Sequence, residues 1–366
     1  MNLMSSLLVA LFSSFITTFL IIRFEHVHGH ISGDSDLSGP QKFHHATVSR
    51  VGGISIMVGI LLATLIRLQS SSSISTELVL LACTTPVFAI GLAEDLTKKV
   101  GVKLRLLGIA IGAGLASHYL GIQITRLDIP GIDYVLSLPG VAVIFTVFAI
   151  TGLANAYNII DGFNGLSSMV GIITLMGMTY VSYLVQDPML MYLSLVMASS
   201  ILGFFIWNYP RGLIFLGDGG AYLIGFWIAV VSVLLVARHS NISPWFALLV
   251  NGYPILETIF TIYRRVIHQG KSPGLPDGIH FHTLIFRRIL HGASTSKQKD
   301  RLTSNARTAP YLWILSGLAV TPAILWWDSS FTLIFFSATF IISYVWVYKR
   351  VVMFKTPRWM HLYKGF

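Results

Sequence analysis

Long apolar runs recur along the whole chain, and short polar segments separate them. Most runs approach the roughly 20 residues that a helix needs to cross about 30 Å of hydrocarbon. The pattern predicts an all-α, polytopic integral membrane protein that forms one membrane-embedded domain over residues 1–366. About eleven transmembrane helices are expected, at 2–22, 51–68, 77–94, 104–120, 139–157, 165–185, 189–207, 213–236, 244–262, 310–327 and 330–349.

The basic residues predict the orientation of these helices. The chain has 25 Lys and Arg against 15 Asp and Glu, a net charge of +10. If the N-terminus is outside, all of the basic residues except Arg67, Arg126 and Arg238 face the cytoplasm. This asymmetry follows the positive-inside rule and places the C-terminus in the cytoplasm. Because topology accounts for the charge, no nucleic-acid binding is expected.

Composition narrows the class of protein further. The chain is 54% hydrophobic and 11% charged, whereas soluble domains carry about 25% charged residues. This excludes a water-soluble globular enzyme, a disordered protein and a fibrous protein. Cys83 is the single cysteine, so the chain has no internal disulfide and no thiolate metal site.

Polar and ionisable residues gather where several predicted helices end on the cytoplasmic side. Ionisable groups are costly in a membrane and are usually functional. Carboxylates suit Mg²⁺, and Lys, Arg and His suit a diphosphate. The set therefore favours an anionic substrate held with a hard cation, beside the large cytoplasmic loops 23–50 and 263–309. Its members are Glu94, Asp95, Lys98, Lys99, Asn155, Asn158, Asp161, Asn208, Asp218, Glu257, Arg264, Arg265, His280 and His282.

Each of these residues also has a simpler structural explanation. The Glu94–Asp95 pair fits a solvated helix end, Asn155 and Asn158 fit hydrogen bonds between helices, and Asp218 between glycines fits a turn. His26, His28 and His30 lack the spacing of a metal site and are interpreted as solvated. What favours function is that the whole set lies on one side of the membrane.

Five segments, in order, resemble motifs of one family, the polyprenyl-phosphate N-acetylhexosamine-1-phosphate transferases. This family includes enzymes that initiate O-antigen. The segments are Lys42-Phe-His44 with Arg50-Val-Gly52-Gly53; Glu94-Asp95-Leu-Thr-Lys98; Asn155-Ala-Tyr-Asn158-Ile-Ile-Asp161-Gly162-Phe-Asn164-Gly165; Asn208-Tyr-Pro210 with Phe215-Leu-Gly217-Asp218-Gly219; and Glu257-Thr with Arg264-Arg265 and Asp277…His280-Phe-His282.

The resemblance implies transfer of an N-acetylhexosamine 1-phosphate from a UDP-sugar to polyprenyl (undecaprenyl) phosphate, with release of UMP, at a bacterial inner membrane. It implies Mg²⁺, or Mn²⁺, on Asp218 and Asp161. A homodimer is one expectation, although no interface can be identified in the sequence. The implied catalytic residues are Glu94, Asp95, Asp161, His280 and His282, and the implied substrate-binding residues are Lys42, His44, Lys98, Asn155, Asn158, Asn164, Asn208, Arg264 and Arg265.

The chain departs from the family pattern at several positions. Glu94 and Glu257 stand where Asp is usual, and Gly219 follows Asp218 where Ser or Thr is usual. Gly278 replaces an Arg, and Thr283 replaces a His. These last two changes lie where sugar discrimination is expected, which favours a modified, for example deoxygenated, N-acetylhexosamine as the donor.

Two other classes of protein compete with this interpretation. A transporter or flippase for an anionic lipid or sugar nucleotide would explain the basic loops, but it predicts ionisable residues at mid-membrane and inverted repeats. Only Glu257 lies well inside a predicted span, and no repeat is visible. A CDP-alcohol phosphotransferase would need a motif that is absent after Asp161-Gly162.

Overall fold

The computed structural model is an all-helical bundle and describes residues 3–33, 48–68, 76–138, 140–270, 272, 277–290, 298–357 and 360. Within these ranges the only β-structure is an isolated bridge between Gly33 and Ser49. Eight helices are long and apolar enough to cross a membrane: α1 (Leu3–Arg23), α4 (Thr76–Thr97), α7 (Val141–Ile160), α8 (Leu166–Leu184), α9 (Pro188–Asn208), α10 (Gly217–Arg238), α14 (Gln298–Leu325, from Ser304 onward) and α15 (Ser330–Val352).

The remaining helices are shorter or less apolar. A bent pair, α11 (Pro244–Val250) and α12 (Gly252–Tyr263), would bring the number of candidate spans in the described ranges to nine. The others are α2 (Glu25–Ser32), α3 (Gly52–Leu68), α5 (Val102–Tyr119), α6 (Ile132–Leu136), α13 (Phe281–Ile285) and two π-helical turns, η1 (Arg264–His268) and η2 (Phe286–Leu290). Each of the eleven segments predicted as spans therefore contains a helix, although α3, with 17 residues, is short for a crossing.

Two segments differ from their predictions. The segment 244–262 is not one straight helix, because α11 and the helix that follows it meet at an angle of 77°. At the break, the Asn251 amide donates to Ser232 Oγ (3.1 Å) and to the Ala247 carbonyl (2.9 Å), and Pro254 in the next turn has no N–H. The predicted span 310–327 belongs to a helix that begins earlier, at Gln298.

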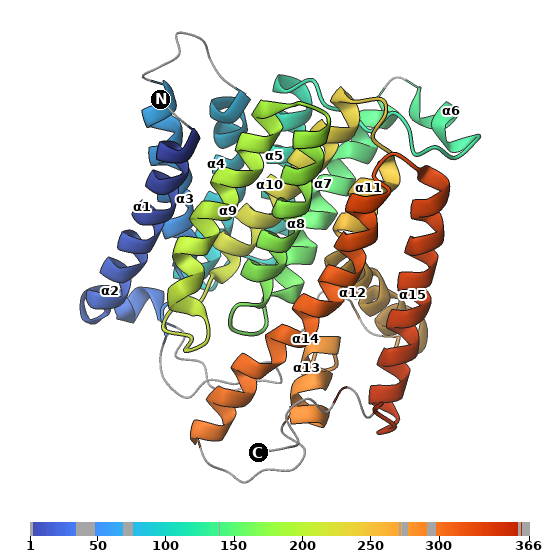
Figure 1. The fold of residues 1–366 in the computed structure, drawn as a ribbon. Helices are drawn as coiled ribbons and strands as arrows, with labels where there is room; N and C mark the ends of the chain where they lie inside the picture. Colours follow the sequence, from blue (N-terminus) through green and yellow to red (C-terminus); the bar gives the residue numbers. More distant parts are fainter. Residues whose placement is uncertain are drawn as a thin grey trace.

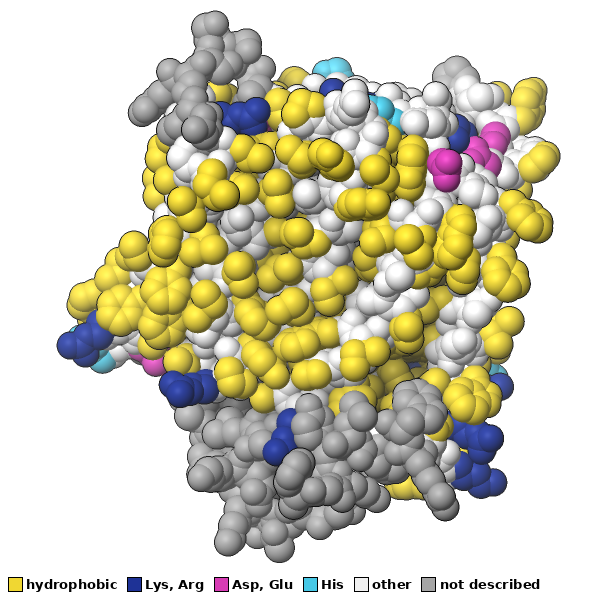
Figure 2. Space-filling view, in the orientation of Figure 1, with side chains coloured by type: hydrophobic (Ala, Val, Ile, Leu, Met, Phe, Trp, Pro, Cys, Tyr) yellow, Lys and Arg dark blue, Asp and Glu magenta, His cyan; other side chains and the backbone are white. Residues whose placement is uncertain are grey.

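Helix α10 lies at the centre of the bundle, in contact with α3, α4, α5, α7, α8 and α9 (Figure 1). Every residue from Gly217 to Leu235 is buried, which suits a helix that is apolar on all sides. On the face shown in Figure 2, apolar side chains form a broad band, and Lys and Arg side chains lie toward its two ends. The bundle thus has the surface of a protein embedded in lipid.

The predicted cytoplasmic and outer segments lie at opposite ends of the bundle (Figure 1). Helices α2 and α13 lie at the lower end in this view, and α6 lies at the upper end. At the end opposite the candidate site, Asp187 begins α9 and accepts hydrogen bonds from the amides of Met189 (3.1 Å) and Leu190 (3.0 Å). It also pairs with Arg238 (3.2 Å) and His239 (3.0 Å).

Asp187 thereby ties the start of α9 to the end of α10. Burial of its carboxyl would raise the pKa, but the hydrogen bonds and the neighbouring basic groups outweigh burial, so the pKa lies below its usual value.

Candidate active site

The first turn of α10 carries Asp218 and is packed unusually closely against two other helices. Gly217 has φ +76°, and a Cβ there would lie 1.9 Å from the Arg50 carbonyl oxygen. A Cβ on Gly219 would meet the backbone of α4, and the backbone of Gly220 approaches Gly53 at the start of α3. The glycines around Asp218 therefore allow three helices to meet, which a simple turn would not require.

Asp95 in α4 anchors this helix end. Its two carboxylate oxygens accept the backbone N–H groups of Asp218 and Gly219, each at 2.9 Å, and its side chain is 1% exposed. The first N–H groups of a helix have no partner within the helix, and the macrodipole favours negative charge beside them. Asp95 therefore caps α10 from a neighbouring helix and fixes the position of Asp218.

Three side chains from other helices converge on the Asp218 carboxylate. Arg50, just before α3, lies 3.6 Å from it, and Arg105 in the first turn of α5 forms an ion pair and hydrogen bond with it. The Asn158 amide, from the end of α7, donates to it at 3.0 Å. Asn155 is half-buried one turn earlier in α7. The result is a partly buried site with two guanidinium groups at the N-terminus of a helix.

Asp161 directly follows α7 and belongs to the same electrostatic cluster. Burial, together with the carboxylates of Asp218 and Asp95, raises the pKa of its carboxyl to about 8, and Arg50 acts in the opposite direction. Three predicted acids are thus close enough to influence one another. Among the described residues, no group of three or more His, Cys, Asp or Glu side chains forms a ready-made metal cage.

Two predicted substrate-binding amides hold loops together. The Asn208 side chain accepts the N–H of Gly165 (2.6 Å) and donates to the Ile214 carbonyl (2.7 Å). The Asn164 side chain donates to the Pro210 carbonyl (3.3 Å). Both residues are buried, and they join the loop after Asp161 to the loop that leads into α10. Their observed contacts connect these two loops and so support the site indirectly.

Glu94 and Lys98, both predicted in the sequence analysis, make contacts near the end of α4. Glu94 accepts the N–H of Val100 (2.7 Å) and so holds the turn between α4 and α5. The Lys98 ammonium donates to the Gly33 carbonyl (2.9 Å). Lys42 and His44 fall outside the described residues.

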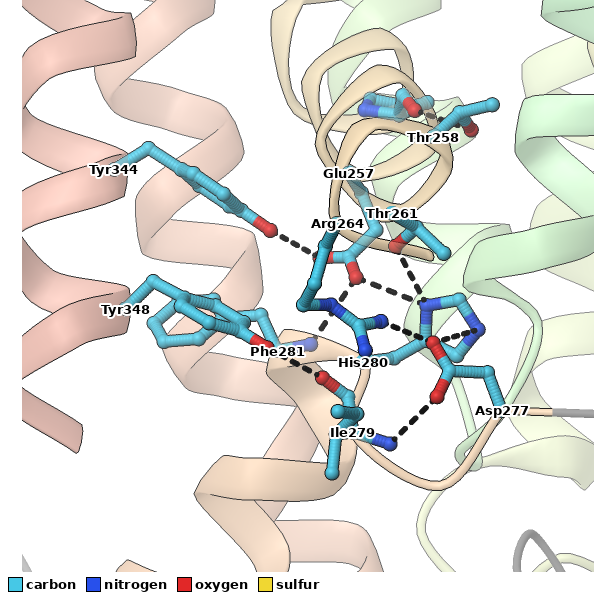
Figure 3. A network of polar contacts seen from close by, with 11 residues as sticks. Glu257, Thr258, Thr261, Arg264, Asp277, Ile279, His280, Phe281, Tyr344 and Tyr348 are labelled. Carbon is cyan, nitrogen blue, oxygen red and sulfur yellow. Dashed lines mark hydrogen bonds and ion pairs between the residues drawn. The ribbon is translucent and has the colours of Figure 1, made fainter. Parts of the chain in front are cut away.

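A second polar cluster surrounds Glu257 of α12 (Figure 3). Glu257 Oε1 accepts the Nδ1–H of His280 and the N–H of Phe281, both at 3.1 Å, and its side chain is 1% exposed. Arg264 forms an ion pair with Asp277, whose carboxylate also lies 3.8 Å from His280 Nε2. These contacts fix the loop that carries His280 against α12. Arg265 is buried beside Arg264.

His282 connects the two clusters. Its ring stacks on His280 with centroids 5.1 Å apart and packs edge-on against Phe163. A Cβ on Gly162 would lie 2.8 Å from its Nε2 atom, so the imidazole touches the backbone that follows Asp161. Burial, reinforced by the neighbouring His280, lowers the pKa of His282 to about 3, which keeps the His282 ring neutral.

Comparison with known proteins shows the family of this chain. Residues 77–236 match the model of glycosyl transferase family 4. The chain is 30% identical, over 68% of each protein, to an undecaprenyl-phosphate alpha-N-acetylglucosaminyl 1-phosphate transferase of Yersinia pestis. The chain belongs to the polyprenyl-phosphate N-acetylhexosamine-1-phosphate transferases.

Other members of this transferase family are similarly related. A probable undecaprenyl-phosphate N-acetylglucosaminyl 1-phosphate transferase of Bacillus subtilis is 29% identical over 68% of this chain and 69% of its own length. An undecaprenyl-phosphate alpha-N-acetylglucosaminyl 1-phosphate transferase of Escherichia coli is 28% identical over 76% of each protein. The matched region 77–236 holds Asp95, Asp161 and Asp218, whereas the Glu257 cluster lies beyond it.

Four charged residues of the site were given no catalytic, substrate-binding or metal role in the sequence analysis, although Glu257 was counted in the polar set. Arg50, Arg105, Glu257 and Asp277 all make ion pairs within the two clusters. The motif segments include Arg50, Glu257 and Asp277, so their place in the sequence could have identified them as site residues. Arg105 had no such signal, because a basic residue at the cytoplasmic end of a helix is what topology alone predicts.

Proposed function

We propose that this transferase moves an N-acetylhexosamine 1-phosphate from a UDP-sugar to polyprenyl phosphate. An oxygen of the lipid phosphate attacks the β-phosphorus of the donor, the bond from that phosphorus to the bridging oxygen breaks, and UMP leaves. The observation that carries the proposal is the convergence of Arg50, Arg105 and Asn158 on Asp218 at a helix N-terminus. Such a site offers hydrogen-bond donors and positive charge to a diphosphate.

Mg²⁺ fits the donor set of this site. Asp161 and Asp218 are carboxylates whose charges act on each other strongly enough to raise the pKa of Asp161. Mg²⁺ is usually held by one or two carboxylates, with water and substrate phosphates completing its shell, so a cage of three protein ligands is not needed. We therefore assign Mg²⁺, or Mn²⁺, to Asp218 and Asp161; when bound, it neutralises charge on the diphosphate.

The remaining residues are assigned by their position around Asp218. Arg50 and Arg105 are within reach of Asp218 and so can exchange that partner for donor phosphate oxygens. Asp95 holds the helix end, and Glu94 and Lys98 lie where the acceptor phosphate can approach. We assign Asn155 and Asn158 to the nucleotide side of the donor. The side-chain amides of Asn164 and Asn208 hold the two neighbouring loops together by hydrogen bonds.

The second cluster is assigned to the sugar phosphate. His282 reaches the backbone beside Asp161, and His280 stacks on it. Arg264 and Arg265 supply positive charge from the end of α12. Gly278 lies just before α13 and Thr283 lies in α13, on either side of His280 and His282 in the sequence. The departures from the family pattern therefore fall where a modified N-acetylhexosamine would be distinguished from N-acetylglucosamine.

We also propose that the chain crosses a bacterial inner membrane eleven times, with the N-terminus outside and the C-terminus in the cytoplasm. The distribution of Lys and Arg supports this orientation. It requires α3 and α5 to cross in addition to the nine candidate spans of the described ranges. The site then faces the cytoplasm, where UDP-sugars are available, and the product begins a lipid-linked glycan such as O-antigen.

The test is a transfer assay with the purified protein, undecaprenyl phosphate, Mg²⁺ and a panel of UDP-N-acetylhexosamines. We expect UMP release that depends on both the lipid and Mg²⁺ and is lost in Asp218→Asn. The best donor identifies the sugar. If folded protein binds nucleotide sugar but releases no UMP with any donor, the transferase proposal is wrong and transport takes its place.

A further inference from the structure

The last helix, α15, contributes two tyrosine hydroxyls to the Glu257 cluster (Figure 3). Tyr344 is 1% exposed, and its O–H donates to Glu257 Oε2 at 2.7 Å. Tyr348, one turn later, donates to the Ile279 carbonyl at 3.0 Å. The Tyr344 hydroxyl therefore binds a carboxylate, whereas the Tyr348 hydroxyl binds the backbone of the loop that carries His280.

The bond from Tyr344 determines how Glu257 meets His280. With Oε2 held by Tyr344, the other oxygen is aimed at His280 Nδ1 and at the N–H of Phe281. A carboxylate only accepts hydrogen bonds, so the imidazole hydrogen lies on Nδ1, whereas Nε2 lies 3.8 Å from the Asp277 carboxylate, too far for a hydrogen bond. Thr261 Oγ lies 3.2 Å from the same Nδ1 atom. If Glu257 turned away, this hydroxyl would be the remaining partner of Nδ1 and would not impose the same tautomer.

The effect continues from His280 toward the acids of the first cluster. The His280 ring stacks on His282, and His282 packs against Gly162, the residue after Asp161. Tyr344, Glu257, His280 and His282 are all buried, so a displacement of Glu257 has little room to be absorbed before it reaches Gly162. The series runs from a residue far beyond the matched region 77–236 to one inside it.

We propose that Tyr344 is a positioning residue for the transfer reaction. Through Glu257 it fixes the tautomer and orientation of His280, and through the stacked His282 it fixes the sugar-phosphate side of the site. The proposal rests on the function proposed above. It assigns Tyr348 a different role, because Tyr348 supports the loop without touching the Glu257 carboxylate.

Tyr344→Phe removes the hydroxyl and keeps the ring, and Tyr348→Phe is its matched control. For Tyr344→Phe we expect at least about a tenfold fall in kcat/KM, the lower end of what loss of one hydrogen bond to a charged group gives. In a His280→Ala background, Tyr344→Phe should cause no further loss, because it acts through His280, whereas the effect of Tyr348→Phe should persist. A loss from Tyr344→Phe that multiplies with the His280 loss overturns the proposal.

A second measurement does not depend on activity. Nuclear magnetic resonance of ¹⁵N-histidine-labelled protein in detergent, with the His280 signal assigned by its absence in His280→Ala, reports which ring nitrogen carries the hydrogen. We expect the Nδ1–H form in the unmodified chain and in Tyr348→Phe, and a shifted signal in Tyr344→Phe. An unchanged signal in Tyr344→Phe overturns the positioning role. The expected signals without any transfer activity would instead refute the proposed function alone.

Discussion

Replacement of Asp95 by Asn separates a helix-capping role from a chemical one. Both oxygens of Asp95 accept backbone N–H groups at the start of α10, and the side chain is buried. Asn keeps one acceptor oxygen and presents an NH₂ group to the other N–H. One charge-assisted hydrogen bond is lost, at a cost of about 1.5–3 kcal/mol.

If the activation free energy rises by this amount because Asp218 is misaligned, kcat decreases by roughly 10- to 150-fold, since 1.36 kcal/mol corresponds to one factor of ten. UMP release is the assay, and the thermal unfolding midpoint in detergent should fall as well. Asp187→Asn is a suitable control, because Asp187 also accepts backbone N–H groups at the start of a helix, but at the end of the bundle opposite the site. We expect it to have a much smaller effect on kcat.

Two results would refute this reasoning. Unchanged activity and unchanged thermal stability in Asp95→Asn would mean that the cap does not hold Asp218. A loss of activity far above 1,000-fold with normal stability and normal binding of the UDP-sugar would mean that Asp95 acts on the reactants directly, as the sequence had led us to expect.

Three further predictions follow from the same geometry. Gly217→Ala places a Cβ 1.9 Å from the Arg50 carbonyl oxygen at φ +76° and should prevent stable folding, whereas Gly114→Ala, with open space around it, should leave the thermal midpoint unchanged. Asp218→Asn should lower UMP release by more than about 100-fold at every Mg²⁺ concentration, and near-normal turnover would contradict the metal assignment. Because the pKa of Asp187 is lower in the folded chain than in the unfolded chain, where it is about 3.9, ionised Asp187 stabilises the fold above that pH. This stabilisation is lost as the pH falls through the folded-state pKa. The thermal midpoint of Asp187→Asn should therefore fall less steeply on acidification than that of the unmodified chain.

The helices were the part of the fold most accessible from the sequence. A run of about 20 apolar residues has few alternatives in a membrane, because every backbone polar group must be paired within the segment. The break at Asn251 was missed, since Asn251 and Gly252 interrupt an apolar run only briefly. The break is held by a hydrogen bond to Ser232 on another helix, and no local pattern reports such a contact.

The candidate site was predictable as a region but not as a set of contacts. Counting charges at helix ends located the acids, yet Asn164 and Asn208 proved to hold loops, and Arg105 proved to pair with Asp218. The rotation of each helix about its axis decides which of several polar residues faces the site. The glycines beside Asp218 were interpreted as part of a turn. In the structure they allow the backbones of three helices to approach one another closely.

The arrangement of the chain is consistent with the different roles that we propose for the two clusters. The acids and the arginines around Asp218 come from α3, α4, α5, α7 and α10, which pack around one central helix and have little freedom to move. The Glu257 cluster comes from α12, the following loop and α15, outside the matched region. A rigid first cluster suits the part of the reaction that every UDP-sugar shares, the diphosphate. A second cluster built on a loop can vary with the sugar, and the contact of His282 with Gly162 is where a change in that loop reaches the diphosphate side.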